Sequence, residues 1–176
     1  MRPTAAQAET ARQVPPRDQL AGEIVVVGAH GGAGTTTLAI LLQPSWDLGA
    51  VRRPTRDRPC IWPTWGRPLV LVSRNTAMAA ARTIAAVNAI TRQGERVAVL
   101  AVVSDGLPEP AAAAYRFQVL DARVDAVVHV PFIASLRTAD DPAQVDLPRR
   151  ARRSIAAIRA TAVAGVTVQA PLIRTP

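Results

Sequence analysis

Residues 23–37 read EIVVVGAHGGAGTTT, an apolar β-branched run followed by a glycine-rich turn. Four consecutive apolar residues that end at Gly28 are typical of a buried parallel strand. The next six residues, 29–34, contain three glycines and do not favour regular structure. Residues 35–42 then predict a short helix, which Pro44 ends. This succession of strand, loop and helix decides the fold class.

The rest of the chain repeats the alternation of strands and helices. Because the two kinds of element alternate four times, the sequence predicts one α/β domain with a mainly parallel sheet covered on both faces. Further strands are predicted at 69–72, 96–103 and 126–130, and further helices at 75–92, 108–120 and 146–162. We expect a flexible leader at 1–20, the domain at 21–165 with a basic proline-rich insertion at 51–68, and a tail at 166–176.

Composition limits the classes of function. The 176 residues suit one domain, and 49% of them are hydrophobic, which excludes disorder throughout. All 21 basic residues are arginine against 13 acidic residues, so the net charge is +8 and no mechanism can use a lysine of this chain. A single cysteine, Cys60, excludes an internal disulfide framework and a cysteine-rich zinc site. No apolar run approaches a membrane span and residues 1–19 lack an apolar signal core, so we expect a cytoplasmic protein.

The glycine-rich loop predicts a phosphate-binding site. Glycines let the backbone curl until successive N–H groups point into one concavity, and the following helix adds its own free N–H groups. Such a cup binds phosphate without a charged side chain. A hydroxyl just after the cup, as at Thr36, is where a phosphate-binding loop supplies a magnesium ligand. The alternative is a turn whose glycines only let helix and sheet pack closely.

Residues 30–37, HGGAGTTT, resemble the deviant Walker A motif KGGxGKTT of the MinD/ParA family. The resemblance implies a three-layer P-loop NTPase-like domain that binds ATP or another nucleoside phosphate with Mg²⁺, dimerises with nucleotide and hydrolyses it. It also implies that the magnesium ligand is Thr36. The phosphate-binding residues implied by the resemblance are His30, Gly31, Gly32, Ala33, Gly34, Thr35, Thr36 and Thr37.

The chain departs from the family at both motif lysines, whose places His30 and Thr35 take. Loss of such a preorganised donor to the transferred phosphoryl group typically lowers the rate by about 10²–10³. Arg74, or an arginine of a partner subunit, is a candidate substitute. The family's Walker B strand is not recognisable between residues 44 and 68, where only Asp47 remains as a candidate metal ligand. We therefore expect a shortened, degenerate member with weak or no ATP hydrolysis.

Two strand ends resemble the part of the family that contacts the base. Residues 102–105 look like the strand end whose polar residue faces the base, and residues 128–132 look like the turn beside it. The base-contact candidates are therefore Asp105 and Pro131. Asp105 has a second interpretation, as the cap of the turn that follows it. His129, inside an apolar strand, is interpreted as a hydrogen-bonded core residue.

Arginines gather in two segments, 51–68 and 149–159, and the second segment contains no acid. In the predicted last helix, the arginines lie opposite an apolar stripe. Such a face is typical of contact with nucleic-acid phosphates and also of a solvated helix surface. Trp62 and Trp65, in the first segment, are interpreted as a cover over the core in preference to base-stacking residues. The nucleic-acid-binding candidates are Arg149, Arg150, Arg152, Arg153 and Arg159.

Three functions remain open from the sequence. The first is a nucleotide-binding or nucleotide-responsive accessory protein, a pseudo-ATPase, in a bacterial DNA-handling system such as partition, conjugation or a mobile element. The second is a nucleotide-free basic module that binds DNA or an acidic protein. The third is an ATPase that an arginine in trans completes. The family resemblance adds a homodimer to the expected partner states.

Overall fold

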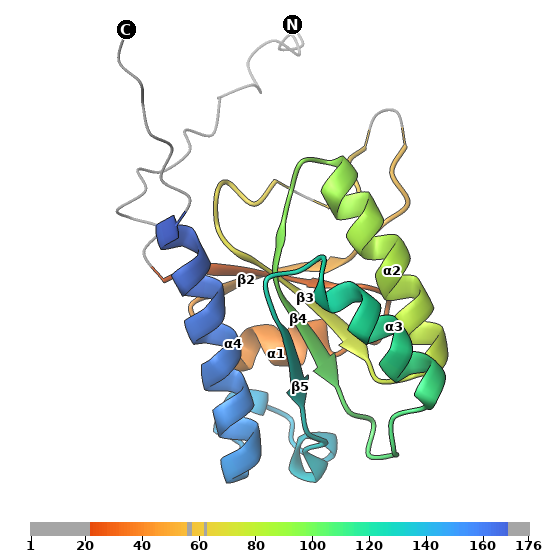
Figure 1. Cartoon of the computed structure of the whole chain (residues 1–176). Helices are drawn as coiled ribbons and strands as arrows, with labels where there is room; N and C mark the ends of the chain where they lie inside the picture. The colour runs from red at the N-terminus through yellow and green to blue at the C-terminus, as the bar shows by residue number, and fades with distance from the viewer. Residues whose placement is uncertain (1–21, 56–57, 62, 169–176) are drawn as a thin grey trace, which may run out of the picture.

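The computed structural model describes residues 22–55, 58–61 and 63–168. These residues form a parallel five-stranded sheet with helices on both faces, which makes three layers (Figure 1). The prediction of an α/β domain with a mainly parallel sheet is thus confirmed. The strands are β1 (Ile24–Gly28), β2 (Ser45–Ala50), β3 (Leu69–Arg74), β4 (Val97–Val103) and β5 (Val127–Val130). The helices are α1 (Thr35–Leu41), α2 (Ala77–Arg92), α3 (Ala111–Asp121) and α4 (Arg149–Val168), with two 3₁₀-helices, η3 (Ala134–Arg137) and η4 (Pro142–Gln144), before α4.

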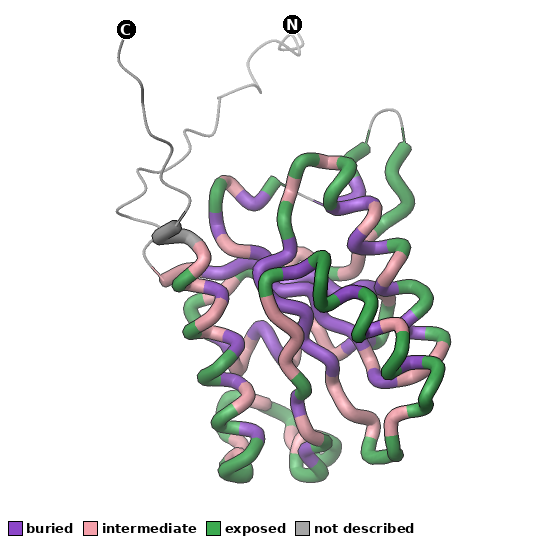
Figure 2. The backbone as a smooth tube through the Cα atoms, in the orientation of Figure 1, coloured by how far each residue is buried: buried purple, intermediate pink, exposed green. Residues whose placement is uncertain are grey.

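Alternating side chains of the central strands supply two hydrophobic cores. Val25, Val27 and Leu71 belong to the core that includes apolar side chains of α2 and α3. Val26 and Val70 belong to the core that includes apolar side chains of α1 and α4. Figure 2 shows buried backbone concentrated along the strands between these helices. Continuous apolar strands are the expected consequence of burial on both faces.

The order of the strands is β2-β1-β3-β4-β5. After β1, the chain passes to one side to form β2 and then returns to the other side of β1 to form β3. In open parallel sheets, ligands bind beside the carboxyl ends of the strands at such a point of reversal. The two segments that meet there are the glycine-rich loop after β1 and the end of β3, where Arg74 contacts the Gly32 carbonyl oxygen.

Strand β2 lies in a part of the chain, residues 44–68, for which the sequence predicts no regular structure. It pairs in parallel with β1, and Val26 lies opposite Asp47. Its sequence, SWDLGA, contains a glycine and an aspartate and has no buried residue. An edge strand of this kind has no apolar run and no strict alternation to reveal it. Within 51–68, the described residues form no helix or strand, as predicted.

The helix ends lie within two residues of the predicted ends in α1 and α2, whereas α3 starts at Ala111, three residues after the predicted start at 108, and α4 differs at both ends. Helix α2 begins after Thr76, whose Oγ1 accepts a hydrogen bond from the Ala79 N–H at 3.2 Å, and Gly94 beyond its end has a φ of 82°. The sequence predicts helix α4 at 146–162, but the helix starts at Arg149 and continues to Val168. The helix therefore extends three residues into the predicted tail. The predicted leader and the remainder of the tail lie outside the described residues.

Within the described part of the chain, none of the helices has both the length and the apolar character that crossing a membrane requires.

Candidate functional site

The glycine-rich loop leaves β1 with an open backbone. Gly32 and Gly34 have positive φ angles of 75° and 93°, and Gly34 is the N-cap of α1. Among the described residues, a Cβ placed on Gly31, Gly32 or Gly34 would meet no atom within 4 Å beyond its chain neighbours and, for a glycine in a helix, the helix's own backbone. The space beside these three glycines is therefore not filled by the protein's own side chains.

Thr35 has a structural position at the base of this loop. A Cβ placed on Gly28 would overlap Thr35 Oγ1 and come within 3.1 Å of the His30 carbonyl oxygen. The Thr35 hydroxyl therefore lies against the end of β1. Only glycine at position 28 leaves room for it, which gives Gly28 a packing role in addition to ending the strand.

Thr36 and Asp47, the two candidate metal ligands, lie in contact. Thr36 Oγ1 donates a hydrogen bond to Asp47 Oδ2 at 2.7 Å, and Asp47 Oδ1 accepts one from the Gly49 N–H at 2.8 Å. Because the hydroxyl hydrogen points at the carboxylate, the oxygen lone pairs remain available to a cation. The pair exists because β2 lies beside β1, so Asp47 reaches the start of α1.

Thr36 and Asp47 offer too few oxygen ligands to hold a magnesium ion unless a bound phosphate and waters supply the rest. Hard cations of this kind take oxygen ligands and usually keep several waters while binding substrate phosphates. In the described residues, no group of three or more His, Cys, Asp or Glu side chains is placed to hold a metal. Thr36 and Asp47 would therefore hold magnesium through a nucleoside phosphate rather than as an independent metal centre.

Arg74 and His30 cover the same loop. Arg74, at the end of β3, donates from Nε to the Gly32 carbonyl oxygen at 3.2 Å. His30 Nδ1 contacts the Gly31 carbonyl oxygen at 2.9 Å, and its Nε2 accepts from the Arg74 N–H at 3.5 Å. These two bonds suit a neutral imidazole protonated at Nδ1. His30 therefore orders the loop backbone, and the candidate substitute for the missing lysines lies beside the glycines.

A hollow, the β3–β5 cavity, lies beyond the carboxyl ends of β3, β4 and β5. It measures about 360 Å³, and Pro131 lines it, as predicted for a base contact. Asp105 is not among the lining residues. Asp105 Oδ1 accepts from the Leu107 N–H at 2.9 Å, so its carboxylate caps the turn, the second of its two predicted roles.

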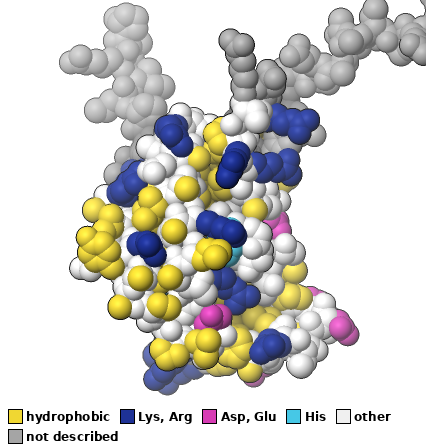
Figure 3. Space-filling view, turned by 90° about the vertical axis from the view of Figure 1, so that its right-hand side faces the viewer, with side chains coloured by type: hydrophobic (Ala, Val, Ile, Leu, Met, Phe, Trp, Pro, Cys, Tyr) yellow, Lys and Arg dark blue, Asp and Glu magenta, His cyan; other side chains and the backbone are white. Residues whose placement is uncertain are grey.

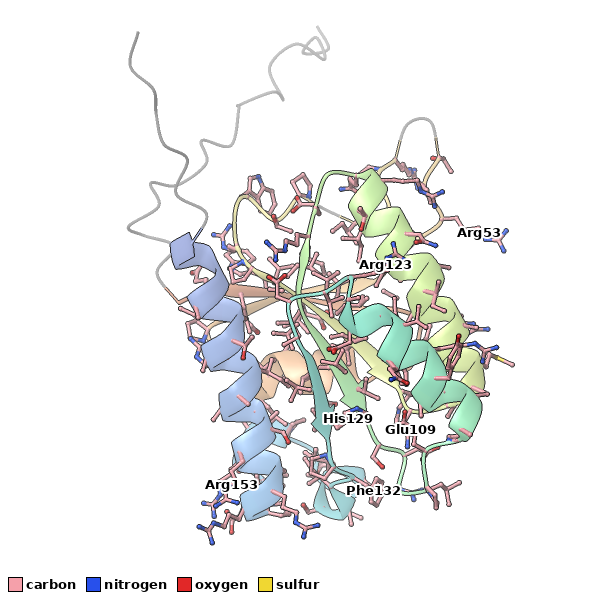
Figure 4. All side chains as sticks on the ribbon, viewed as in Figure 1. Arg53, Glu109, Arg123, His129, Phe132 and Arg153 are labelled. Atoms are coloured by element: carbon pink, nitrogen blue, oxygen red, sulfur yellow. The ribbon has the colours of Figure 1, made fainter. Side chains whose placement is uncertain are left out.

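The interpretation of His129 as a core residue is wrong. Its side chain is 58% exposed and its Nδ1 lies 3.4 Å from Glu109 Oε2. Both residues line the β3–β5 cavity, and Figure 4 shows them facing each other beside β5. The cause is the position of β5 at the edge of the sheet, where the face of the strand that carries His129 is not covered. Sequence reasoning missed Glu109 altogether, and the only signal was an acid in the loop before a helix.

Four arginines form an exposed cluster at the start of α4. Within the described residues, none of the four forms an ion pair. Helix α4 has no acidic residue in its first turn, where the positive end of the helix dipole favours acids and disfavours cations. The arrangement is therefore unfavourable for the helix alone. The cluster consists of Arg149, Arg150, Arg152 and Arg153.

Arg159 does not belong to this cluster, which corrects its place among the nucleic-acid-binding candidates. Its two guanidinium nitrogens donate to the carbonyl oxygens of Leu42, at 2.5 Å, and Gly22, at 2.8 Å. Arg159 therefore ties α4 to the end of α1 and to the segment before β1. Position 159 lies on the same face of the predicted helix as the other arginines, but its long side chain reaches back to the carbonyl oxygens of Leu42 and Gly22.

The opposite end of β1 carries a cluster around Arg67. Its guanidinium lies 5.0 Å from the ring centre of Trp46 and 5.9 Å from that of Trp65. Glu23 Oε2 accepts from Arg67 Nε at 2.7 Å and from Trp46 Nε1 at 3.0 Å, and these two hydrogen bonds lower the pKa of Glu23. Trp65 thus packs locally, as predicted. Trp62, the other tryptophan of that prediction, lies outside the described residues.

The remaining prominent surface lies on α2 and α3. Met78 and Tyr115 are both 67–69% exposed there, and Val119 is 47% exposed. Figure 3 shows apolar side chains and arginines interspersed on this side of the molecule, with few acids. Cys60, near the α2 end, is buried, which raises the pKa of its thiol, and its Sγ contacts Gln93 Oε1 at 2.7 Å. A hollow of about 500 Å³ near Cys60 is lined by Arg58, Arg92 and Gln93.

Comparison of the chain with protein-family models, with curated proteins and with solved structures finds no match. The family resemblance therefore stays a prediction that rests on residues 30–37, and the geometry of the strand ends is the basis for a function.

Proposed function

We propose that this chain is a nucleotide-binding protein of MinD/ParA type that has lost most or all of its hydrolytic power. The observation that carries the proposal is the hydrogen bond between Thr36 and Asp47 beside an unfilled glycine loop. A glycine turn that served only close packing would need neither a carboxylate aimed at its second threonine nor open space beside its glycines. The absence of lysine from the whole chain accounts for the expected loss of hydrolysis.

In this proposal each group of residues has a separate part in binding. Backbone N–H groups of residues 31–36 receive the phosphate oxygens, and the Thr36 hydroxyl is oriented by Asp47. A bound Mg²⁺ supplies neutralisation of phosphate charge there. Arg74 supplies a fixed positive charge at the loop. Its planar guanidinium stabilises the transferred phosphoryl group less well than the compact ammonium group of a lysine would. The β3–β5 cavity beside Pro131 receives the base.

Calorimetry with ATP, ADP, GTP and GDP, with and without Mg²⁺, tests this function. We expect saturable heat that increases with Mg²⁺, and phosphate release no faster than in buffer. Gly31 has no positive φ and no neighbour within 4 Å, so Gly31→Asp adds a negative charge to the loop without backbone strain. It should abolish binding, whereas Gly31→Ala should retain it. An absence of heat at millimolar nucleotide, or full binding by Gly31→Asp, would refute the proposal.

A second function, binding to DNA, is favoured by the arginine cluster of α4. Four cations at the positive end of a helix dipole are unfavourable unless an anionic partner lies against them. DNA phosphates provide such a partner without any requirement for sequence recognition. We propose that this cluster makes the chain a nucleotide-responsive component of a DNA-handling system.

Fluorescence anisotropy with a labelled duplex tests the DNA contact. Replacement of Arg149, Arg152 and Arg153 by alanine should weaken binding and lower the slope of log K against log salt by about 0.9 for each phosphate that the variant no longer neutralises. The matched control replaces Arg53, Arg82 and Arg123, three exposed arginines elsewhere, and changes the net charge equally. Equal weakening in both triple variants would show only a net-charge effect, and this would reject the cluster as the DNA site.

A further inference from the structure

The β3–β5 cavity contains two charged groups whose chemistry restricts its ligand. Glu109, with a side chain 21% exposed, comes from the loop before α3, and Arg150 comes from the first turn of α4. Helices α3 and α4 cover opposite faces of the sheet (Figure 1), and both residues line the cavity. The cavity therefore offers a charged acceptor and a planar charged donor.

The neutral polar side chains of the cavity are largely occupied. Asn75 donates from Nδ2 to the Leu107 carbonyl oxygen at 3.2 Å, and its Oδ1 accepts from the Asp105 N–H at 3.1 Å. The Ser154 hydroxyl donates to the His129 carbonyl oxygen at 2.9 Å. Ser104 Oγ accepts from the Gly106 N–H at 3.1 Å. His129 also lines the cavity, with its Nδ1 3.4 Å from Glu109 Oε2, so a ligand meets the Glu109 carboxylate beside this imidazole and the Arg150 guanidinium.

We infer that the base held in this cavity is guanine and that Glu109 and Arg150 determine this specificity. The inference rests on the proposed nucleotide-binding function. Guanine presents two adjacent acceptors, O6 and N7, which suit a bidentate arginine. It also presents adjacent N1–H and N2–H donors, which suit a carboxylate with two oxygens. Both edges of the base thus find the partner of opposite hydrogen-bonding character.

Adenine fails at both groups. Its exocyclic amine places donors where O6 of guanine has acceptors, so an arginine there meets donor against donor. Its unprotonated N1 faces the Glu109 carboxylate with acceptor against acceptor. The apolar lining residues, Val102, Val130 and Pro131, carry no hydrogen-bonding side chain and do not discriminate between the two bases. The cavity volume of about 360 Å³ lies in the range that ligand pockets of proteins span.

Competition between diphosphates measures this specificity, because the phosphate contacts are then constant. We expect the full chain to bind GDP about tenfold to a hundredfold more tightly than ADP. IDP lacks the 2-amino group and should fall between the two. Equal affinities, or a preference for ADP, would overturn the guanine inference while the nucleotide-binding function stands. Failure of all three diphosphates to bind would overturn the function as well.

Two substitutions assign the effect to the residues. Glu109→Gln should remove most of the preference for GDP over ADP and improve binding of XDP, because an amide donor can face the second carbonyl oxygen of xanthine. Arg150→Ala should weaken GDP more than ADP. The matched controls are Asp121→Asn and Arg123→Ala, both exposed beyond the cavity. Circular dichroism confirms that each variant is folded, and an unchanged GDP-to-ADP ratio in folded Glu109→Gln would reject the assignment.

Discussion

Replacement of Asp47 by alanine separates the contribution of this carboxylate to the stability of the fold from its contribution to metal affinity. The substitution removes the acceptor of the Thr36 hydroxyl, at 2.7 Å, and of the Gly49 N–H, at 2.8 Å. Both donors are exposed and regain water, so the net decrease in stability should be about 1 kcal/mol. For a chain of this size, that lowers the Tm by roughly 2–4 °C.

The effect on metal affinity should be larger than the effect on stability. Asp47 orients the Thr36 oxygen, and removal of a residue that orients a metal ligand typically costs about 10–100-fold in metal affinity. The Mg²⁺ concentration that half-saturates the enhancement of GDP binding should therefore rise by that factor in Asp47→Ala. Calorimetry over a Mg²⁺ series measures it, with differential scanning fluorimetry for the Tm. Asp140→Ala, at another exposed aspartate, is the control. If the two variants have the same Mg²⁺ dependence, Asp47 does not serve the metal.

Three further substitutions test the packing that supports the site. Gly28→Ala should lower the free energy of unfolding by about 1–3 kcal/mol, because the new methyl group overlaps the Thr35 hydroxyl. Urea unfolding should show that adding Thr35→Ala restores most of this stability. A double variant no more stable than Gly28→Ala would contradict the packing. Glu23→Gln should destabilise the protein at neutral pH. Because the folded pKa of Glu23 is lowered by its hydrogen bonds, the difference should disappear as pH falls from the ordinary value of 4.5 through the folded pKa, whereas a difference constant with pH would exclude this role. Arg159→Ala should lower the free energy of unfolding by about 1–3 kcal/mol, because two carbonyl oxygens lose their donor. The control, Arg153→Ala at an exposed position, should change it by less than about 0.5 kcal/mol. Equal changes in thermal unfolding would contradict the hydrogen bonds of Arg159.

The sequence predicts the parts of the fold that depend on local pattern. Strands β1, β3 and β4 are buried on both faces and therefore consist mostly of consecutive apolar residues, which locate them in the sequence. Strand β2 escapes such reasoning because an exposed edge strand needs only backbone pairing, and SWDLGA has no pattern that distinguishes it from a loop. The limits of α4 also escape the local pattern, since the helix starts three residues later and ends six residues later than the apolar period predicts.

The candidate site divides in the same way. The glycine loop and Thr36 are visible from spacing within eight residues. The contact of Thr36 with Asp47 requires β2 to lie beside β1, and the contact of His129 with Glu109 requires β5 to be an edge strand. Arg159 shows the converse error, since its helical angle indicated the exposed face whereas its side chain reaches two carbonyl groups 117 and 137 residues away in sequence.

Strand β2 carries Trp46 next to Asp47 in sequence, but the two side chains point to opposite faces of the strand, and the indole lies at the end of β1 away from the glycine loop. Trp46 precedes Asp47, is 49% exposed, and stands against the Arg67 guanidinium. A displacement of β2 on loading of the loop would change the water around this ring and its distance from a quenching cation. The chain has three tryptophans, and Trp65 also lies near the Arg67 guanidinium, so a shift in emission wavelength on addition of nucleotide would report a change around this tryptophan–arginine cluster.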